Sequence, residues 1–312
     1  MQRVDNRSGL LYIQSHFLRA DGGAVQHRGL RQGGSLHATI ARRNRLRPKK
    51  SLGQHFLHDP NIVRKILAAI GADREDVVLE IGPGEGALTR HLVKVVKTLV
   101  AVEIDERAVE RLRGELGGSV QILHQDVLEL DLRRIASDTG AHRGLRVVGN
   151  IPYNITTPIL FAVLDQRKVV RDATLMMQRE VAHRLVAVPG TKDYGILSVF
   201  CRVFADVQLL FDVSPKVFVP QPAVTSSVVY LQPLIRPRAP IRDESFFRHM
   251  VRFVFGQRRK MLRHTLAELA REYNRSLPAE FDLRERPEEL TGEELVDLAN
   301  RLRAALGIES PA

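Results

Sequence analysis

Short apolar runs alternate with amphipathic helical patterns along this chain from residue 60 onward. Several of the runs are rich in valine and isoleucine, which is typical of buried strands. Because helical patterns separate most of the runs, the sequence predicts a doubly wound α/β fold with a mostly parallel sheet. The predicted strands are Val77–Ile81, Leu99–Ile104, Val120–Leu123, Arg146–Gly149, Thr174–Met177, Val207–Val213 and Ser227–Leu231. The predicted helices are Asn61–Ile70, Ala87–Val96, Ala108–Leu116, Pro158–Leu164, Glu180–Val188 and Gly195–Phe204.

The last two of these seven strands depart from the alternation. Only the proline-rich turn Ser214–Pro222 separates them, so we expect a final antiparallel hairpin. A linker containing Pro233, Pro237 and Pro240 follows. Beyond it the chain is helical by period and has no strand candidate, in the stretches Ser245–Glu272 and Glu288–Leu306.

Residues 1–47 differ in composition from the rest of the chain. They are rich in Gly, Arg, Ser and Gln and show no sustained period, which predicts a disordered basic extension. Such an Arg-rich, acid-poor segment also suits an organellar transit peptide or an over-long start. We therefore expect three parts, namely this extension, an α/β domain at 48–234 and a small helical domain at 235–312.

Charge is distributed unevenly between these parts. The formal net charge of +11 is typical of proteins that bind nucleic acid. Residues 1–50 hold eleven Lys and Arg against Asp5 and Asp21, which leaves 36 Lys and Arg against 34 Asp and Glu for residues 51–312. The folded part is thus close to neutral, and any binding of RNA has to depend on local patches.

The single cysteine, Cys201, excludes an internal disulfide and a cysteine-based metal centre. No apolar run reaches the length of a membrane span, and no secretory signal is recognisable. These features predict a cytoplasmic protein without a membrane partner, or a mitochondrial matrix protein if residues 1–47 are a transit peptide. We interpret Met176, Met177 and Cys201 as core packing.

The stretch Val77–Gly86 is a predicted strand that runs into three glycines. Gly82, Gly84 and Gly86 permit a tight turn and let a ligand approach the backbone closely. A helix starting near Ala87 would direct its free amides at that ligand. The spacing is G-x-G-x-G after an acidic residue, which resembles the class I methyltransferases that bind S-adenosylmethionine. A nicotinamide dinucleotide site, which favours G-x-G-x-x-G, and a plain strand–turn–helix joint are the alternatives.

Two carboxylates follow the next predicted strands. Glu103 lies at the end of Leu99–Ile104, where it can accept hydrogen bonds from both hydroxyls of a ribose. Asp126 follows Val120–Leu123 and could accept from an adenine amino group in the same crevice. The alternative for Asp126 is an ordinary helix cap.

The most specific stretch is Asn150-Ile-Pro-Tyr153, at the end of the fourth predicted strand. An adenine amino nitrogen is a poor nucleophile, because its lone pair is delocalised into the ring. The Asn150 side-chain carbonyl and the Ile151 backbone carbonyl can accept both N–H groups, and Pro152 restricts the local backbone. Tyr153 offers a ring on which a base can stack. A simple Asn-Pro turn is the alternative.

These residues carry a family resemblance. Asn150–Tyr153 resembles the N-[IL]-P-Y motif of methyltransferases that act on adenine amino groups in RNA. The stretches Lys50–Leu57, Val217–Ser226 and Phe255–Leu262 narrow the likeness to the ribosomal small-subunit RNA adenine N6-dimethyltransferases. The likeness runs from about residue 48 to residue 305, and residues 1–47 have no recognised counterpart.

The resemblance implies dimethylation of two adjacent adenosines near the 3′ end of 16S-type RNA, with S-adenosylmethionine as methyl donor and no metal. It also implies roles for single residues. Phe218 would pack on the flipped adenine opposite Tyr153, and Asn150 would serve both cofactor and target amine. Position 55 is Asn in many members and His here, so an ordinary loop histidine is the alternative there. The implied cofactor-binding residues are His55, Leu57, Gly82, Glu103, Asp126 and Asn150.

Basic residues crowd what we expect to be the first helix of the C-terminal domain. They suit phosphate contacts, which position RNA without reading its sequence, although a solvated helical face is the alternative. We expect Phe253 and Phe255 to belong to the core. The predicted RNA-binding residues are Arg258, Arg259, Lys260 and Arg263, with Arg252 nearby and a second cluster at Arg47, Lys49 and Lys50.

The resulting hypothesis is a monomeric enzyme of ribosome biogenesis whose partner is small-subunit ribosomal RNA or a pre-30S-type particle. Its active site should favour an unpaired or extruded adenine. The nearest alternative enzyme is a 23S-type adenine dimethyltransferase, against which the Gln257–Lys260 stretch argues. A non-catalytic assembly or transcription factor with the same fold is the alternative from another class.

Overall fold

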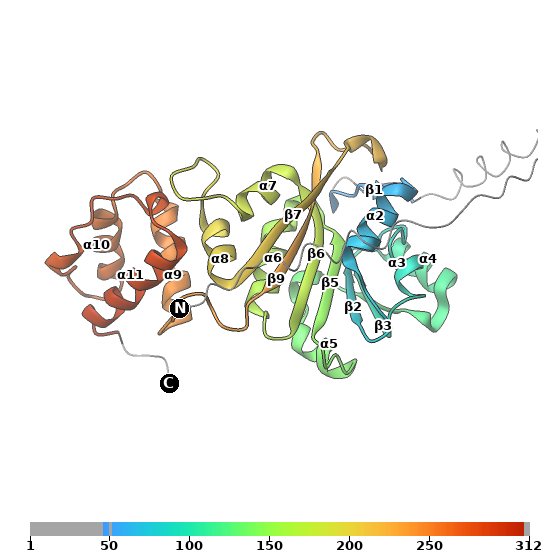
Figure 1. Cartoon of the computed structure of the whole chain (residues 1–312), viewed down its shortest axis with the longest axis horizontal. Coiled ribbons are helices and arrows are strands. Elements are labelled where there is room, and N and C mark those ends of the chain that lie inside the picture. Colours follow the sequence, from blue (N-terminus) through green and yellow to red (C-terminus); the bar gives the residue numbers. More distant parts are fainter. Residues whose placement is uncertain (1–45, 50–51, 309–312) are drawn as a thin grey trace, which may run out of the picture. The chain divides into compact units, whose positions relative to one another are not determined.

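The computed structural model describes residues 46–49 and 52–308, which belong to one compact unit, Leu46–Ala312. Its main sheet has seven strands in the order β4-β3-β2-β5-β6-β9-β7 (Figure 1). The strands β2 to β6 pair in parallel, whereas β9 pairs antiparallel with both β6 and β7. The predicted α/β class and the final antiparallel hairpin are therefore confirmed. The strands are β2 Val77–Ile81, β3 Thr98–Glu103, β4 Gln121–His124, β5 Leu145–Asn150, β6 Val170–Gln178, β7 Ala205–Val213 and β9 Ser226–Pro233.

Helices cover both faces of this sheet because successive residues of its buried strands point to opposite sides. Val77, Leu79 and Ile81 pack in one core cluster with residues of α5 to α8, whereas Val78 packs in the other with residues of α2, α3 and α4. Met176, Met177 and Cys201 are buried, as expected. The helices are α2 Pro60–Ile70, α3 Thr89–Leu92, α4 Glu106–Leu116, α5 Leu132–Asp138, α6 Thr156–Asp165, α7 Arg179–Leu185 and α8 Ile196–Phe204.

The C-terminal helices are α9 Glu244–Gly256, α10 Leu262–Glu272 and α11 Gly292–Ala305 (Figure 1). The expectation of one helix over Ser245–Glu272 is wrong. The backbone amides of Leu262 and Arg263 donate to the carbonyls of Glu285 and Leu283, so a neighbouring segment rather than a continuous helix satisfies them. Buried side chains of all three helices belong to the core cluster that also covers the sheet. The division at residues 234 and 235 stays a prediction.

Some helix boundaries also differ from the prediction. The helix expected over Ala87–Val96 is the four-residue α3, and α11 begins at Gly292 rather than at Glu288. Thr291 caps α11 by accepting from the amide of Glu294. The predicted extension at residues 1–47 lies, except for Leu46 and Arg47, outside the described residues. In the part of the chain that the structure describes, no helix is long and apolar enough to cross a membrane.

A second, two-stranded sheet ties the start of the described chain to the Pro-rich turn. β1, Phe56–Leu57, pairs antiparallel with β8, Phe218–Val219, and the His58 amide donates to the Val217 carbonyl at 3.0 Å. Neither strand was predicted, because two-residue strands leave no periodic signal. The consequence is that residues 52–57, the N-terminal arm, lie against the carboxyl edge of the main sheet.

Candidate active site

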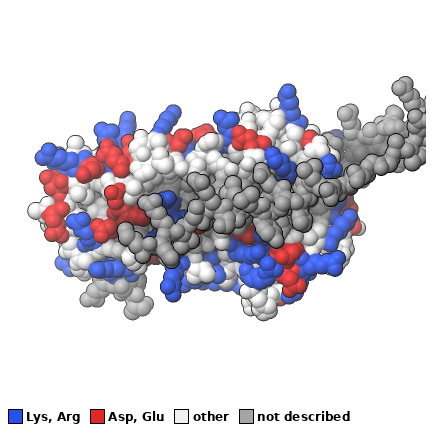
Figure 2. Space-filling model, viewed as in Figure 1, with Lys and Arg blue, Asp and Glu red and all other residues white. Residues whose placement is uncertain are grey.

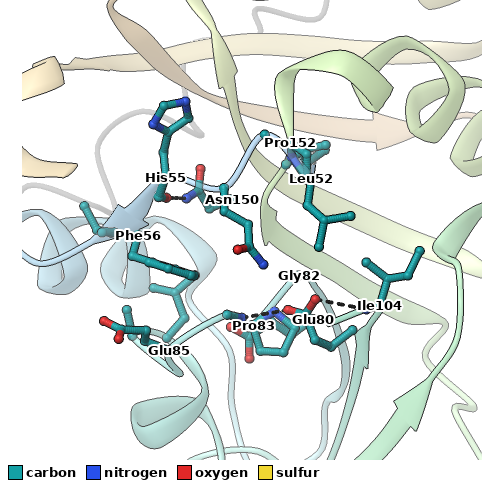
Figure 3. Close-up of a pocket in the computed structure, with 18 of the residues that line it drawn as sticks. Leu52, His55, Phe56, Glu80, Gly82, Pro83, Glu85, Ile104, Asn150 and Pro152 are labelled. Carbon is teal, nitrogen blue, oxygen red and sulfur yellow. Dashed lines mark hydrogen bonds between the residues drawn. The ribbon is translucent and has the colours of Figure 1, made fainter. Parts of the chain in front are cut away.

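A pocket lies at the carboxyl ends of β2, β3 and β5, where ligands bind in doubly wound sheets. Figure 3 shows His55, Asn150, Pro152 and Leu52 on one side of it, and Gly82, Pro83 and Ile104 on the other. Its walls come from the N-terminal arm at 52–57, Glu80, the loop at 82–85, the end of β3 and residues 150–153. The structure thus brings together the glycine loop, Glu103 and the Asn150 motif, which lie far apart along the chain.

The glycine loop begins where β2 ends at Ile81. Gly82, Gly84 and Gly86 all have positive φ, between 53° and 79°, a conformation that glycine adopts without strain. A Cβ added to Gly86 would lie 2.7 Å from Leu112 Cδ2, so the loop also packs closely on α4. The helix expected near Ala87 starts at Thr89 instead. The Gly84 amide donates to Glu103 Oε2 at 3.0 Å.

Glu103 closes β3 and lines the pocket. Its Oε1 accepts from the amides of Ile104 and Asp105, each at 2.9 Å. Burial raises the pKa of the Glu103 carboxyl above its ordinary value, against the opposing effect of these amides. The amides fix the orientation of the carboxylate, and an anionic carboxylate has lone pairs left to accept from a ligand hydroxyl.

Glu80 is a pocket residue to which the sequence reasoning gave no role. It is 2% exposed on β2 and points to the face covered by α2, α3 and α4, where a strand residue is normally apolar. Among the described residues, Glu80 Oε2 and the buried Thr89 hydroxyl form no hydrogen bond of normal geometry, although Thr89 lies close enough to the Glu80 carboxyl to oppose part of the effect of burial on its pKa. Burial raises the pKa of Glu80 from 4.5 to about 7. The sequence feature that could have identified Glu80 as a site residue is its position as the acidic residue just before the three glycines.

Asn150 is held in one orientation by the N-terminal arm. Its Nδ2 donates to the backbone carbonyl of His55 at 2.8 Å (Figure 3). Because that carbonyl can only accept, the amide nitrogen faces the arm and Oδ1 is left as the acceptor for another group. Ile151 is buried and lines the pocket, and its amide donates to the Met176 carbonyl at 3.0 Å.

The arm in turn is anchored at Asp105, whose side chain is fully buried. Asp105 Oδ1 accepts from Lys49 Nζ at 3.2 Å, Oδ2 accepts from Gln54 Nε2 at 3.0 Å, and Arg107 binds both oxygens. The bond from Arg107, aided by Gln54 and Lys49, holds the pKa of Asp105 well below its usual range. A permanent anion behind the pocket thus fixes the arm that carries His55.

Tyr153 lines the same pocket beside Asn150. Its hydroxyl lies 2.7 Å from the hydroxyl of Ser226, and its ring stacks on that of His55 with centroids 5.5 Å apart. Burial raises the pKa of Tyr153 above 10, so the phenol stays neutral near pH 7. The tyrosine ring is therefore held at its hydroxyl and on one face.

Two candidates from the sequence lie elsewhere in the described part of the chain. Asp126 caps the short 3-10 helix Val127–Glu129 by accepting from the Leu128 amide at 2.9 Å, and it is not among the pocket-lining residues. Phe218 on β8 is 2% exposed and packs in the core cluster that also holds Val63. Leu57 lines the pocket. The ligand contacts of all three stay predictions.

The basic candidates lie at the turn between α9 and α10 and at the start of α10, which corrects their expected place on one helix. Most of them bind acidic groups of this chain. Arg258 pairs with Glu288 and donates to the carbonyls of Thr191 and Lys192. Lys260 pairs with Glu268, and Arg263 pairs with Asp282.

Arg259 forms no ion pair with any described residue. Arg252 lies over the rings of Phe161 and Phe200, and Phe255 is buried, as expected. In Figure 2, acidic and basic side chains alternate over the visible face of the C-terminal helices. Of the second cluster, Lys50 lies outside the described residues. Binding of RNA by these side chains stays a prediction.

The seven-stranded sheet with its antiparallel β9, and a glycine loop and acidic residue at its carboxyl edge, define a class I methyltransferase. The model of the protein family described as "Ribosomal RNA adenine dimethylase" matches residues 45–303 of this chain. The chain therefore belongs to the ribosomal RNA adenine dimethylase family and is a methyltransferase.

Similar proteins agree with this assignment. The chain is 47% identical over 257 residues to ribosomal RNA small subunit methyltransferase A of Chlorobium phaeobacteroides, covering 82% of this chain and 94% of the relative. A dimethyladenosine transferase structure from Plasmodium falciparum has the same fold, with a TM-score of 0.63 and 24% identity over 81% of this chain and 99% of that one. The structure of 23S rRNA methyltransferase ErmE gives a TM-score of 0.57 and 25% identity, covering 79% and 99%.

Proposed function

We propose that this enzyme transfers methyl groups from S-adenosylmethionine to the N6 atoms of two adjacent adenosines near the 3′ end of small-subunit ribosomal RNA. The observation that carries the proposal is the convergence of Asn150, Tyr153 and Glu103 on one pocket. Membership of the family supports the reaction, and the similarity to a bacterial ribosomal RNA small subunit methyltransferase A supports the choice of subunit. The substrate would be ribosomal RNA or a pre-30S-type particle, and the enzyme would act as a cytoplasmic monomer.

The residues that line the pocket fit S-adenosylmethionine. Glu103 would accept hydrogen bonds from the ribose hydroxyls, and Gly82, which has no side chain, leaves room for close approach to the backbone. The buried Glu80 oxygen without a partner suits a ligand that carries positive charge. S-adenosylmethionine would supply a methyl group on a sulfonium, which is electrophilic without a metal. Among the described residues no group of His, Cys, Asp and Glu could hold a metal ion.

The residues around Asn150 can activate an adenine amine by position and electrostatics. Asn150 Oδ1 would accept one N6–H and the Ile151 carbonyl the other, which favours a pyramidal nitrogen with an available lone pair. Tyr153 would stack on the base, a contact worth about 1–3 kcal/mol per base. No strong general base is needed, because the product carries a positive charge and can release its proton to water afterwards.

The proposal can be tested with radiolabelled S-adenosylmethionine and small ribosomal subunits that lack dimethyladenosine. We expect label in N6-dimethyladenosine near the 3′ end of the small-subunit RNA. Asn150→Ala should abolish it, whereas Asn61→Ala, which removes an exposed asparagine from α2, should leave it unchanged. Label on large-subunit RNA alone would support the 23S-type alternative that the likeness to ErmE keeps open. Cofactor binding without any labelled RNA would refute catalysis on ribosomal RNA and favour a binding factor.

A further inference from the structure

His55 touches three separate parts of the site. Its backbone carbonyl accepts from Asn150 Nδ2, its Nδ1 lies 2.8 Å from the Pro220 carbonyl, and its ring stacks on that of Tyr153. Pro220 follows β8 in the Pro-rich turn. His55 therefore connects Asn150 at the end of β5, Tyr153 three residues later, and the Pro-rich turn at Pro220, which lies 165 residues further along the chain than His55.

The contact with Pro220 fixes the orientation of the imidazole. A carbonyl oxygen can only accept a hydrogen bond, so Nδ1 of His55 is the donor and carries the proton. The ring cannot rotate away from Tyr153 without breaking this bond. The backbone of His55 is held independently, because residues 56 and 57 pair with β8. The His55 ring is thus fixed by its bond to Pro220, and the His55 backbone is fixed by the strand pairing that follows it.

The geometry of the pair leaves one face of Tyr153 for a base. The two ring centroids are 5.5 Å apart and the planes differ by 29°. A single stacked aromatic pair already has its centroids about 4.5–7 Å apart, so no third ring fits between His55 and Tyr153. A base that stacks on Tyr153 must take the opposite face.

We propose that His55 is a positioning residue of the target-base site, whose ring supports Tyr153 and restricts the adenine to the other tyrosine face. This inference rests on the proposed function. It differs from the role that the family resemblance implies for position 55, which is contact with the cofactor. An asparagine at this position could donate to the Pro220 carbonyl but has no aromatic ring to stack on Tyr153.

Three substitutions separate the possible roles of this side chain. His55→Phe keeps an aromatic ring without the hydrogen bond, His55→Asn keeps hydrogen-bonding capacity without the ring, and His55→Ala removes both. We expect His55→Ala and His55→Asn to raise the KM for RNA roughly three- to tenfold, as loss of one aromatic pair predicts. His55→Phe, which keeps the ring but loses the bond to Pro220, should raise this KM less than either of the other two variants does. The dissociation constant of S-adenosylmethionine should change less than twofold in all three variants.

The matched control is His142→Ala, which removes a histidine from the loop between α5 and β5, away from the carboxyl edge of the sheet. It should leave both constants unchanged. If His55→Asn keeps the original KM for RNA, the stacking contact is dispensable and the proposal is wrong. If the variants weaken only cofactor binding, His55 belongs to the cofactor site instead.

A second readout does not depend on methyl transfer. The ring-proton NMR shifts of Tyr153, assigned with Tyr153→Phe, should change in His55→Ala and His55→Asn, because the neighbouring ring current is lost. Changed shifts in an enzyme that methylates no RNA would reject the proposed function but retain the ring contact. Unchanged shifts would reject the inference while leaving the proposed function intact.

Discussion

Replacing Glu80 with glutamine should stabilise the ligand-free protein at alkaline pH and weaken its binding of cofactor. Glu80 is 2% exposed, and burial raises its pKa from 4.5 to about 7. Below pH 4.5 the carboxyl is protonated in both the folded and the unfolded protein. Between pH 4.5 and 7 the unfolded state releases this proton while the folded state retains it, so stability falls as pH rises. Above pH 7 the full cost of a buried anion is present.

The size of this effect follows from the pKa shift. At about 1.4 kcal/mol per pKa unit, the shift of Glu80 corresponds to about 3 kcal/mol of lost stability at pH 8. Glutamine has nearly the same shape and stays neutral at every pH. We therefore expect Glu80→Gln to exceed the original protein in free energy of unfolding by up to about 3 kcal/mol at pH 8, and to match it below pH 4.5.

Urea unfolding of the ligand-free protein across this pH range measures the difference. The control is Glu110→Gln, which removes the same charge from an exposed position on α4 and should show a difference close to zero at every pH. A Glu80→Gln protein that is less stable at pH 8, or a difference that does not vary with pH, would refute the reasoning. Calorimetry should in addition show weaker binding of S-adenosylmethionine to Glu80→Gln, because the amide cannot neutralise a cationic ligand.

Three further substitutions test the contacts that hold the pocket residues in place. Ser226→Ala removes the hydrogen-bond partner of the Tyr153 hydroxyl. We expect it to lower the free energy of unfolding by about 1 kcal/mol and to raise the KM for RNA. Adding Tyr153→Phe to this variant should have no further effect on either quantity, because the bond is already lost. Asp105→Asn removes the charge that holds the arm; we expect a loss of about 2 kcal/mol in urea unfolding at neutral pH. Because the pKa of Asp105 is lowered, that loss should shrink as pH falls below 3.8. Gly86→Ala forces a Cβ toward Leu112 at positive φ and should lower thermal stability by about 1–3 kcal/mol.

The sheet could be predicted from the sequence because its strands carry a strong local signal. Val77–Ile81 was predicted with the same boundaries as β2, and the antiparallel ending followed from the lack of a helix between the last strands. The helix after the glycine loop was overestimated. Its apolar residues have helical spacing over Ala87–Val96, but only Thr89–Leu92 is α-helical. The chain forms turns at 84–88, next to the three glycines, and again at 93–95, where the amides of Lys94 and Val95 donate three residues back.

The pocket could be predicted only in part, for a physical reason. Residues at the carboxyl ends of parallel strands converge by topology, so Gly82, Glu103 and Asn150 could be placed together from the strand order alone. The N-terminal arm reaches the pocket through two-residue strands and side-chain contacts such as Gln54 with Asp105. Such contacts join residues distant in sequence and have no period. The stacking of His55 on Tyr153 was accordingly outside the reach of sequence reasoning.

Glu80 is both a buried residue of the sheet and a residue that lines the pocket proposed for the cofactor. It sits in β2 between Leu79 and Ile81, at a position where an apolar side chain would pack against α2, α3 and α4. Valine or leucine would be more favourable there for stability alone, because burial of a carboxylate with only Thr89 to oppose its desolvation is costly. A carboxylate at this position is intelligible if a cationic ligand binds its Oε2. Stability of the ligand-free protein and affinity for the cofactor then depend on the same side chain in opposite directions.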